Sequence, residues 1–317
     1  MAVKVFIDGK EGTTGLRIYE RLADRADVEV ISLPEETRKD PEARRACIHQ
    51  ADVAILCLPD AASRESVALA AGSTTRILDT STAHRVAPGW AYGFPELSEA
   101  HRRAVIEGRF VAVPGCHASG FISLVTPLVA CGMIPKEAQL TCFSLTGYSG
   151  GGKKMIAQYE AESRETELDS PRQYGLSQAH KHLPEMQHVP GLDTAPIFAP
   201  IVADFYSGME VTIPLFASQI RCGAHPVEEL RAALAAHYAG SSVVRVLDAD
   251  QTAALGGFAA SNTLSGHDGM ELMVVGNDER IQLVSRFDNL GKGSSGAALQ
   301  CLNLMIGAEE TSGLALA

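Results

Sequence analysis

The sequence lacks an excess of positive charge and lacks long apolar runs, and these absences exclude several classes of protein. Its 317 residues carry 27 Lys and Arg side chains against 38 Asp and Glu, for a formal net charge of −11. We therefore expect neither a nucleic acid nor an anionic membrane surface as a partner. No apolar run approaches the roughly 20 residues that span a bilayer. The start, with one basic residue before a strand-like run, does not resemble a signal peptide.

Paired cysteine spacings are also missing. The seven cysteines are an odd number, lie far apart and include no C-x-x-C pair. This pattern is typical of a reducing cytoplasm and argues against a disulfide framework or a zinc ribbon.

The composition that is present, 46% apolar and 21% charged, is that of an ordinary globular protein, and the length predicts about two domains. In the first third, short apolar runs alternate with helical stretches, as in a doubly wound parallel sheet. The predicted strands are Val3–Asp8, Val28–Leu33, Val53–Leu58, Thr75–Asp79 and Phe110–Val113, and the predicted helices are Thr14–Asp24, Pro41–Gln50 and Ala62–Ala71.

After about residue 135 the pattern changes to strands with fewer helices between them, which predicts an α+β domain with a largely antiparallel sheet. The predicted strands are Leu140–Thr146, Ala195–Phe205, Glu210–Phe216, Ser242–Leu247, Met270–Val275 and Ile281–Phe287. The predicted helices are Lys153–Glu165, Val227–Tyr238 and Gly293–Ile306, and Asp169–Pro190 is predicted to be a long loop.

The first predicted strand runs directly into a glycine-rich turn. Gly9, Gly12 and Gly15 are spaced as G-x-x-G-x-x-G between strand and helix. Glycine lets the backbone approach a pyrophosphate, and a helix N-terminus supplies N–H donors. We therefore expect a dinucleotide here; a tight turn without a ligand is the alternative.

The end of the second predicted strand bears on the choice between NAD and NADP. Folds specific for NAD usually place a carboxylate there, whereas this chain has Ser32, with Arg38 and Lys39 a few residues further on. The two cations favour NADP, while Glu35 and Glu36 keep NAD as the alternative.

A second glycine run, Gly147–Lys154, fits a phosphate but not an NTPase. It matches G-x-x-x-x-G-K, yet Lys154 stands where a P-loop needs Ser or Thr for magnesium. Consecutive N–H groups in such a run form an anion nest, and Lys153 adds charge. A third run, Gly291–Gly296, has too little chain after it for a βαβ unit and predicts a closely packed helix start.

Cys116 is the candidate nucleophile. It follows a strand and the turn Pro114-Gly115, at or beside the start of a helix. The positive end of a helix dipole lowers a thiol pKa from about 8.5 and favours the thiolate. The other six cysteines are interpreted as packing residues, the usual role of this residue type.

The densest group of titratable side chains is Ala179–Glu185, which includes His180 and His182. A thiolate in covalent catalysis usually needs an acid–base partner, and histidine titrates in the right range. A metal site formed by the H-x-H pair and two solvated loop histidines are the alternatives.

Together these motifs resemble the short form of the N-acetyl-γ-glutamyl-phosphate reductase family, over essentially the whole chain. The residues that carry the resemblance are Gly9–Gly15, Asp79–Arg85, Tyr92–Glu96, Val113–Cys116, Gly147–Lys153, His180–Glu185 and Asp288–Gly293. The chain departs from long-form members at His117-Ala118, where they often have Tyr-Pro, and at Lys153, where they have arginine.

The resemblance implies a fold of the glyceraldehyde-3-phosphate dehydrogenase type and an NADPH-dependent reduction of an acyl phosphate to an aldehyde. A Rossmann-type NADP-binding domain over residues 1–116 and 293–317 would precede and follow an α+β catalytic and oligomerisation domain over 117–292. The expected partners are a small anionic acyl phosphate and further copies of the chain, as a cytoplasmic homodimer or homotetramer. The rivals are an aspartate-semialdehyde dehydrogenase, a nucleotide-sensing regulator without catalysis and, as the weakest, a metal-dependent hydrolase.

The resemblance also implies roles for individual residues. Cys116 would be the nucleophile and His180 the general acid/base, with His182 as the alternative, and no metal is expected. The residues expected at the substrate are Arg85, Ser149, Lys153, His182 and Glu185. The residues expected at the cofactor are Gly9, Gly12, Thr13, Thr14, Gly15, Ser32, Arg38, Leu58, Pro59 and Asn289.

Overall fold

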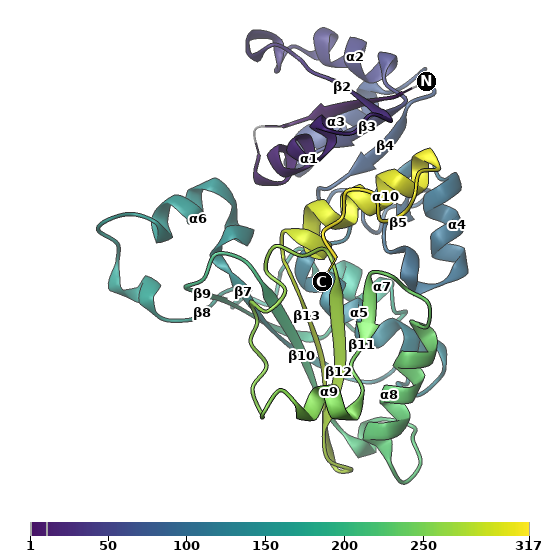
Figure 1. Ribbon diagram of the computed structural model, residues 1–317, viewed down its shortest axis with the longest axis vertical. Coiled ribbons are helices and arrows are strands. Elements are labelled where there is room, and N and C mark those ends of the chain that lie inside the picture. The colour runs from purple at the N-terminus through teal and green to yellow at the C-terminus, as the bar shows by residue number, and fades with distance from the viewer. Residues whose placement is uncertain (1, 11, 317) are drawn as a thin grey trace. The chain divides into compact units, whose positions relative to one another are not determined.

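The computed structural model describes residues 2–10 and 12–316. These residues form two compact units (Figure 1). The described parts of Met1–Pro114 and Ser294–Leu314 make the first unit, and those of Gly115–Gly293 and Ala315–Ala317 make the second. Cys116 therefore lies near the start of the second unit, whereas the sequence-based boundary placed it at the end of the first.

The sheet of the first unit is parallel throughout its described strands. The strand order is β2-β1-β3-β4-β6-β5. The order reverses between β1 and β3, and the carboxyl ends of strands at such a point are where α/β sheets bind ligands. The strands are β1 (Val3–Asp8), β2 (Val28–Ile31), β3 (Val53–Leu56), β4 (Arg76–Asp79), β5 (Ala91–Tyr92) and β6 (Phe110–Ala112).

Helices cover both faces of this sheet, which explains its continuous apolar strands. On β1, Val5 and Ile7 pack in one buried cluster with α1 and α10, while Phe6 packs in another with α2. The helices of the unit are α1 (Thr13–Ala23), α2 (Pro41–Gln50), α3 (Asp60–Leu69), α4 (Glu99–Glu107) and α10 (Gly296–Ile306). The last helix of the chain thus belongs to the first core.

The second unit contains a mixed, mostly antiparallel sheet of order β11-β12-β13-β10-β7-β9-β8. Only the pairs β11/β12 and β7/β9 are parallel among its described strands. The strands are β7 (Thr141–Gly147), β8 (Arg172–Gln173), β9 (Ile197–Ala203), β10 (Met209–Phe216), β11 (Val244–Val246), β12 (Met270–Gly276) and β13 (Arg280–Phe287). The predicted fold class, a Rossmann-type domain plus an α+β domain, is confirmed.

Helices α5 (Cys116–Ala130) and α8 (Pro226–His237) pack on one face of this second sheet. The opposite face is covered over β12 and β13, where Met273 and Val284 pack with Leu255 beyond α9 (Ala249–Ala253). Over β7, β9 and β10 it leaves large apolar side chains exposed, namely Phe143, Ile197 and Phe216. Among the described residues, no helix combines the length and apolar character needed to cross a bilayer.

The prediction of a long loop over Asp169–Pro190 is wrong in its second half. The short helix α7 (Leu183–His188) begins there, with His182 at its N-cap and a proline in its first turn. Proline is favourable in a first turn, because its missing N–H has no intrahelical partner at that position.

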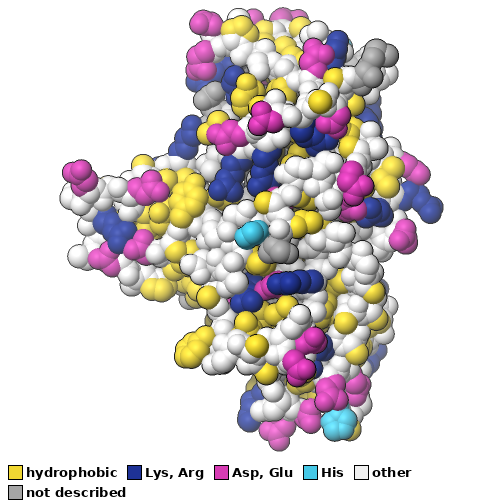
Figure 2. Space-filling view, in the orientation of Figure 1, with side chains coloured by type: hydrophobic (Ala, Val, Ile, Leu, Met, Phe, Trp, Pro, Cys, Tyr) yellow, Lys and Arg dark blue, Asp and Glu magenta, His cyan; other side chains and the backbone are white. Residues whose placement is uncertain are grey.

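Helix α6 (Gly152–Tyr159) is shorter than the predicted Lys153–Glu165. Arg164 turns back to donate to the carbonyl of Tyr159 and forms ion pairs with Asp169 and Asp204, so the chain after Tyr159 folds over instead of continuing. Figure 2 shows acidic and basic side chains close together on the part of the surface formed by α6 and the segment that follows it.

The remaining differences between prediction and structure are in where elements end and in elements that were not predicted. The predicted second strand stops at Ile31 instead of Leu33. The predicted helix over Gly293–Ile306 is a π-helical turn, Gly291–Ser295, followed by α10. Strands β5 and β8 and helices α4 and α9 were not predicted, although Ser98 caps α4 with the expected side-chain bond to the N–H of His101.

Candidate active site

Cys116 is the first residue of α5, in the second unit. The N-cap of the helix is Gly115, which has no capping side chain of its own. Instead the Gly115 N–H donates to the Glu185 carboxylate Oε2 at 3.1 Å. The first N–H groups of a helix have no carbonyl partner within it and carry a partial positive charge. This position favours a thiolate at Cys116 and offers N–H donors to a neighbouring oxyanion.

The two predicted histidines lie beside each other, immediately before α7. Their ring centroids are 4.8 Å apart, and the backbone N–H of His182 donates to His180 Nδ1 at 3.2 Å. Because Nδ1 accepts this bond, a neutral His180 ring carries its proton on Nε2. His182 is buried, with Nε2 4.0 Å from Glu185 Oε1. Glu185 thus joins the start of α5 to His182.

A third histidine, His117, stands beside this pair and was not predicted as a site residue. It is 3% exposed, and its ring lies 5.8 Å from that of His180 and 5.5 Å from that of His182. Its Nδ1 is 2.6 Å from Ser144 Oγ and its Nε2 is 2.6 Å from the Tyr174 hydroxyl. Burial, with smaller contributions from His180 and Lys181, lowers the pKa of His117 to about 3, so the ring is neutral. The signal in the sequence that could have identified His117 as a site residue is its position directly after Cys116.

A hydrogen bond connects Ser149 of the predicted phosphate loop, which is expected at the substrate, with Asn289, which is expected at the cofactor. Asn289 Nδ2 donates to Ser149 Oγ at 3.0 Å, and Asn289 Oδ1 accepts from the Gly208 N–H at 2.9 Å. Asn289 therefore orients Ser149, whose hydroxyl hydrogen is left to donate to an anion. Lys153 is exposed near the start of α6, directly after Gly152, whose φ is 73°.

Arg85, in the first unit, is bonded to the backbone. Its Nε donates to the Val113 carbonyl at 2.9 Å and its Nη2 to the Thr80 carbonyl at 3.1 Å. The surrounding motif is held by Asp79, which binds His84 Nδ1 at 2.6 Å. These two bonds fix the direction of the guanidinium. Its role toward the substrate stays a prediction.

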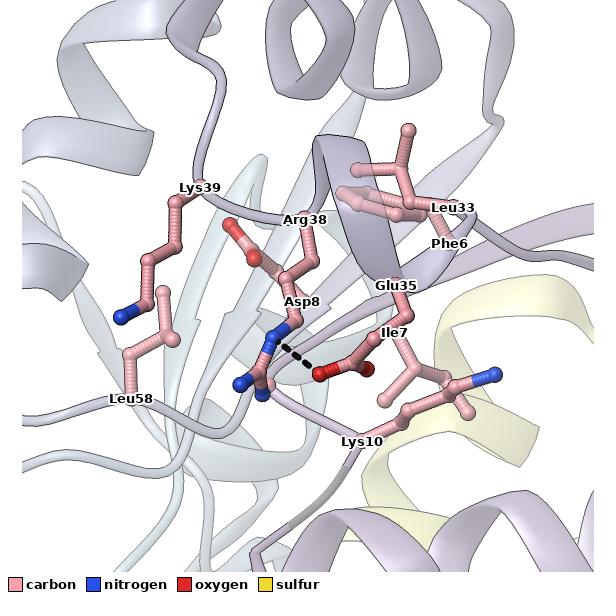
Figure 3. Close-up of a pocket in the computed structure, with 10 residues that line it drawn as sticks. Phe6, Ile7, Asp8, Lys10, Leu33, Glu35, Arg38, Lys39 and Leu58 are labelled. Carbon is pink, nitrogen blue, oxygen red and sulfur yellow. Dashed lines mark ion pairs between the residues drawn. The ribbon is translucent and has the colours of Figure 1, made fainter.

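A cavity of about 170 Å³ lies at the carboxyl end of β1, in the first unit (Figure 3). Gly9, Lys10, Arg38, Lys39 and Leu58 are among the residues that line it. Backbone, three cations and apolar side chains suit the adenosine and phosphates of a dinucleotide. Within the pocket Arg38 Nε is 2.8 Å from Glu35 Oε1. The remaining first-unit residues predicted at the cofactor, Gly12, Thr13, Thr14, Gly15, Ser32 and Pro59, are not among its lining.

The glycine turn itself is packed too tightly for a side chain at two positions. Gly9 has a φ of +89°, and a Cβ there would lie 2.4 Å from the Cys57 carbonyl oxygen. A Cβ on Gly15 would lie 2.5 Å from the Gly9 carbonyl oxygen and 2.8 Å from Lys10 Cα. The start of α1 is also tied to the end of the chain, because Thr14 Oγ1 and Ser294 Oγ are 3.0 Å apart. The turn is thus held by its own backbone and by the segment leading into α10.

The other cysteines differ in their surroundings. Burial raises the pKa of Cys57 to about 12 and also raises that of Cys142. These two, with buried Cys301, match the packing interpretation. The interpretation is wrong for Cys131, which is exposed at the end of α5. Among the described residues, no group of three or more His, Cys, Asp or Glu side chains is placed to hold a metal ion.

Comparison with known proteins assigns both units to families. Residues 4–105 match the family model "Semialdehyde dehydrogenase, NAD binding domain". Residues 116–289 match "Semialdehyde dehydrogenase, dimerisation domain".

Full-length relatives and solved structures extend these matches. Proteins named "N-acetyl-gamma-glutamyl-phosphate reductase" from Brucella ovis and Sinorhizobium medicae are 47% and 46% identical, each over 97% of this chain and 100% of the relative. Aspartate semialdehyde dehydrogenase II of Vibrio cholerae, solved with ASA, superposes with a TM-score of 0.72 at 15% identity, over 96% of this chain and 98% of that one. The Candida albicans enzyme, solved with NADP, gives 0.68 at 15% identity, over 96% and 99%. These structures show the fold.

Proposed function

This chain belongs to the N-acetyl-gamma-glutamyl-phosphate reductase family, and from that premise we propose that it reduces N-acetyl-γ-glutamyl phosphate to the γ-semialdehyde with NADPH, in arginine biosynthesis. One observation carries the proposal. Cys116 opens α5, and the same carboxylate that binds the N–H before it, Glu185, also faces His182. A nucleophile, an acid–base pair and a carboxylate that positions both are thus brought together.

The first chemical step uses the start of α5. The Cys116 thiolate attacks the γ-acyl carbon, and the first N–H groups of the helix stabilise the developing oxyanion. The C–O bond to phosphate breaks, phosphate leaves with the bonding electron pair, and a thioester remains on Cys116. Ser149, oriented by Asn289, is the neutral donor that we assign to the phosphate, with Lys153 as its cation.

The second step uses His180. NADPH supplies a hydride when bound. Hydride addition leaves a negative charge on the oxygen of the thiohemiacetal, and His180 shares the proton of its Nε2 with that oxygen. As the C–S bond breaks, the aldehyde leaves, the thiolate is regenerated and the proton returns fully to Nε2. Glu185 orients His182 beside it. We keep His182 as the alternative acid/base, to be separated by substitution.

We assign cofactor binding to the first unit and catalysis to the second. The cavity after β1 offers Arg38 and Lys39 to a 2′-phosphate, which supports NADP, while Glu35 competes for Arg38 within the same pocket. The Gly9–Gly15 turn would receive the pyrophosphate. A catalytic thiol must stay reduced, so we place the reaction in the cytoplasm.

We also propose that the second unit forms a homodimer through the exposed apolar face of its sheet. Phe143, Ile197 and Phe216 are 50%, 64% and 61% exposed on neighbouring strands. Phe143→Glu together with Ile197→Lys should convert the dimer to monomer in light scattering. The matched control is Phe258→Lys, at a position 85% exposed outside these strands. A double variant that remains dimeric contradicts this interface.

One assay tests the activity. Run in reverse, the enzyme should reduce NADP when given N-acetylglutamate semialdehyde and inorganic phosphate. Turnover with aspartate semialdehyde but not with the acetylated substrate would overturn the proposal in favour of an aspartate-semialdehyde dehydrogenase. Loss of turnover on adding a chelator would favour a metal-dependent reaction instead.

A further inference from the structure

A buried ion pair joins the last residue of β1 to α2 in the first unit. Arg44 and Ile48 are the buried residues of α2. Arg44 donates from Nε and Nη2 to Asp8 Oδ2, at 3.2 and 3.0 Å, and both side chains are almost fully buried. Arginine is rarely buried unless it is paired, so Asp8 explains its place on this face of α2. The function proposed above uses neither residue.

The hydrogen bonds to Asp8 all reach the same carboxylate oxygen. Ser66 on α3 is fully buried, and its hydroxyl donates to Oδ2 at 2.7 Å, beside the two bonds from Arg44. Among the described residues, none donates to Oδ1. Hydrogen bonds that combine a cation with a carboxylate are stronger than neutral ones. The carboxylate is therefore held in its charged form through one oxygen.

Asp8 lines the dinucleotide cavity, whereas Arg44 is not among the residues that line it (Figure 3). The charged residues in the described lining are the cations Lys10, Arg38 and Lys39 and the carboxylates of Asp8 and Glu35. Three positive and two negative charges leave this lining at +1, and Arg44 raises the total to +2. The attraction that this cavity exerts on a phosphate thus depends on a residue outside it.

We propose that Arg44 is a positioning residue that cancels the charge of Asp8 and thereby sets the affinity of this cavity for the phosphates of the dinucleotide. The inference rests on the proposed assignment of the cavity to NADPH. Asp8 ties α2 and α3 to the end of β1 through its bonds to Arg44 and Ser66. The pair keeps these elements together without adding net negative charge where an anion must bind.

One other carboxylate lies near Arg44 but does not face the ligand. Glu65 Oε2 is 3.5 Å from Arg44 Nη1, its side chain is 51% exposed, and it is not among the residues that line the cavity. Water and salt screen an exposed charge of this kind. Asp8 is therefore the carboxylate whose charge Arg44 cancels toward a bound anion.

The test compares ligands that differ in charge, by calorimetric titration with adenosine, 5′-AMP and 2′,5′-ADP. Arg44→Gln leaves the Asp8 charge uncompensated, so affinity should fall about tenfold for 2′,5′-ADP and about threefold for 5′-AMP. Adenosine is neutral, and its affinity should not change. The losses should also shrink at high salt, because ions screen the repulsion.

A second substitution should reverse the first. Asp8→Asn/Arg44→Gln removes both charges, so its affinity for 2′,5′-ADP should return to within about twofold of the wild type. Asp8→Asn alone should bind this ligand more tightly, since Arg44 then adds an uncancelled positive charge. Arg44→Lys keeps the charge and should stay near the wild type. The matched control is Arg45→Gln, which makes the same change in net charge at an exposed position of α2 and should bind as the wild type does.

Two results would overturn the proposal. Equal losses for adenosine and 2′,5′-ADP in Arg44→Gln would mean that the substitution damages the shape of the cavity and not its charge. Failure of Asp8→Asn to restore affinity to Arg44→Gln would mean that Asp8 is not the charge that matters. If Arg44→Gln does not fold, Asp8→Asn is compared with the double variant, which should bind 2′,5′-ADP about tenfold more weakly. Equal affinities of those two proteins would also overturn it.

Turnover measurements separate this inference from the proposed function. In a working reductase, Arg44→Gln should raise KM for NADPH and leave kcat at saturating NADPH unchanged, because the candidate catalytic residues lie in the second unit. A wild type without reductase turnover, but with losses that follow ligand charge, contradicts the proposed function alone. Normal turnover with unchanged nucleotide affinity in Arg44→Gln contradicts the role of Arg44 alone.

Discussion

The two units hold their candidate sites by different means. In the second unit, side chains hold the site in place. Glu185 accepts from the Gly115 N–H before Cys116, Asn289 donates to Ser149, and His117 joins Ser144 to Tyr174. In the first unit, the Gly9–Gly15 turn is shaped by backbone contacts, and two of the three cations of its pocket, Arg38 and Lys39, are exposed. Catalysis in the second unit should therefore depend on the identity of individual residues. Cofactor affinity in the first unit should depend on steric space around the glycine turn and on the net charge of the pocket.

The largest effect should come from removing the nucleophile, which should stop catalysis in the second unit and leave cofactor binding in the first unit intact. Cys116→Ser should lower turnover by about 10⁴- to 10⁶-fold, as loss of a nucleophile does, with NADPH affinity unchanged in a fluorescence titration. Cys131→Ser, at the other end of the same helix, should keep full turnover. Substantial activity in Cys116→Ser would remove Cys116 from this role.

The next largest effect should separate the two neighbouring histidines. His180→Asn should reduce turnover by about 10²- to 10⁴-fold through loss of acid–base catalysis. His182→Asn should cost less, because His182 is buried against Glu185. Steady-state kinetics of both variants measure the difference, and the reverse order would assign the acid–base role to His182.

In the first unit a large effect should come from a single methyl group. Gly15→Ala forces a Cβ against backbone, so NADPH affinity should fall about 10- to 100-fold. A Cβ on Gly12 meets nothing closer than 3.6 Å, so Gly12→Ala should cost less. Calorimetric titration with NADPH compares them, while Cys116 alkylation reports that the second unit is intact. Equal losses would mean that steric space does not govern this turn.

A smaller effect should appear in stability against pH. The folded pKa of His117, about 3, lies below the ordinary value of 6.5. Between those values the unfolded chain binds the extra proton, so stability present above pH 6.5 falls as the pH decreases, by up to about 1.4 kcal/mol per unit. Urea unfolding at pH 6.5 and 5 should show a steeper loss in the wild type than in His117→Gln. Equal losses would indicate that His117 is protonated in the folded protein.

The smallest effect should lie in the exposed charges of the dinucleotide pocket. Arg38→Ala should weaken 2′,5′-ADP binding about two- to tenfold and leave 5′-AMP unaffected, since only the former carries the 2′-phosphate. Glu35→Gln, which frees Arg38 from its ion pair, should change affinity in the opposite direction. If Glu35→Gln instead weakens 5′-AMP, Glu35 contacts the ribose and the pocket prefers NAD.

The same contrast explains what could be predicted from sequence. The first unit follows local patterns: β1 and α2 have the predicted bounds, because continuous apolar runs and a capping Asp40 are local signals. The second site depends on side chains that meet only after folding. No spacing rule relates Ser144, His117 and Tyr174, so their chain could not be predicted. Asn289 was predicted at the cofactor, yet its bond to Ser149 spans 140 residues.

Misleading local signals account for the remaining errors. The segment Asp169–Pro190 was predicted as a loop, yet Pro184 lies in the first turn of α7, where proline is favoured. Arg164 stops α6 by bonding to Tyr159 and to Asp204, a partner 40 residues away. The end of α6 does not follow from propensity, because Asp204 is distant in sequence.

The position of α10 has a consequence for the order in which the protein forms during synthesis. Ala298, Leu299 and Leu302 of α10 share a buried cluster with Val5 and Ile7 of β1, the first strand of the chain. A ribosome adds roughly 5 to 20 residues per second. The apolar face of β1 must therefore wait roughly 10 to 40 seconds, while Gly115–Gly293 are made, before its covering helix exists. During that interval we expect the newborn first unit to present an open hydrophobic surface to chaperones.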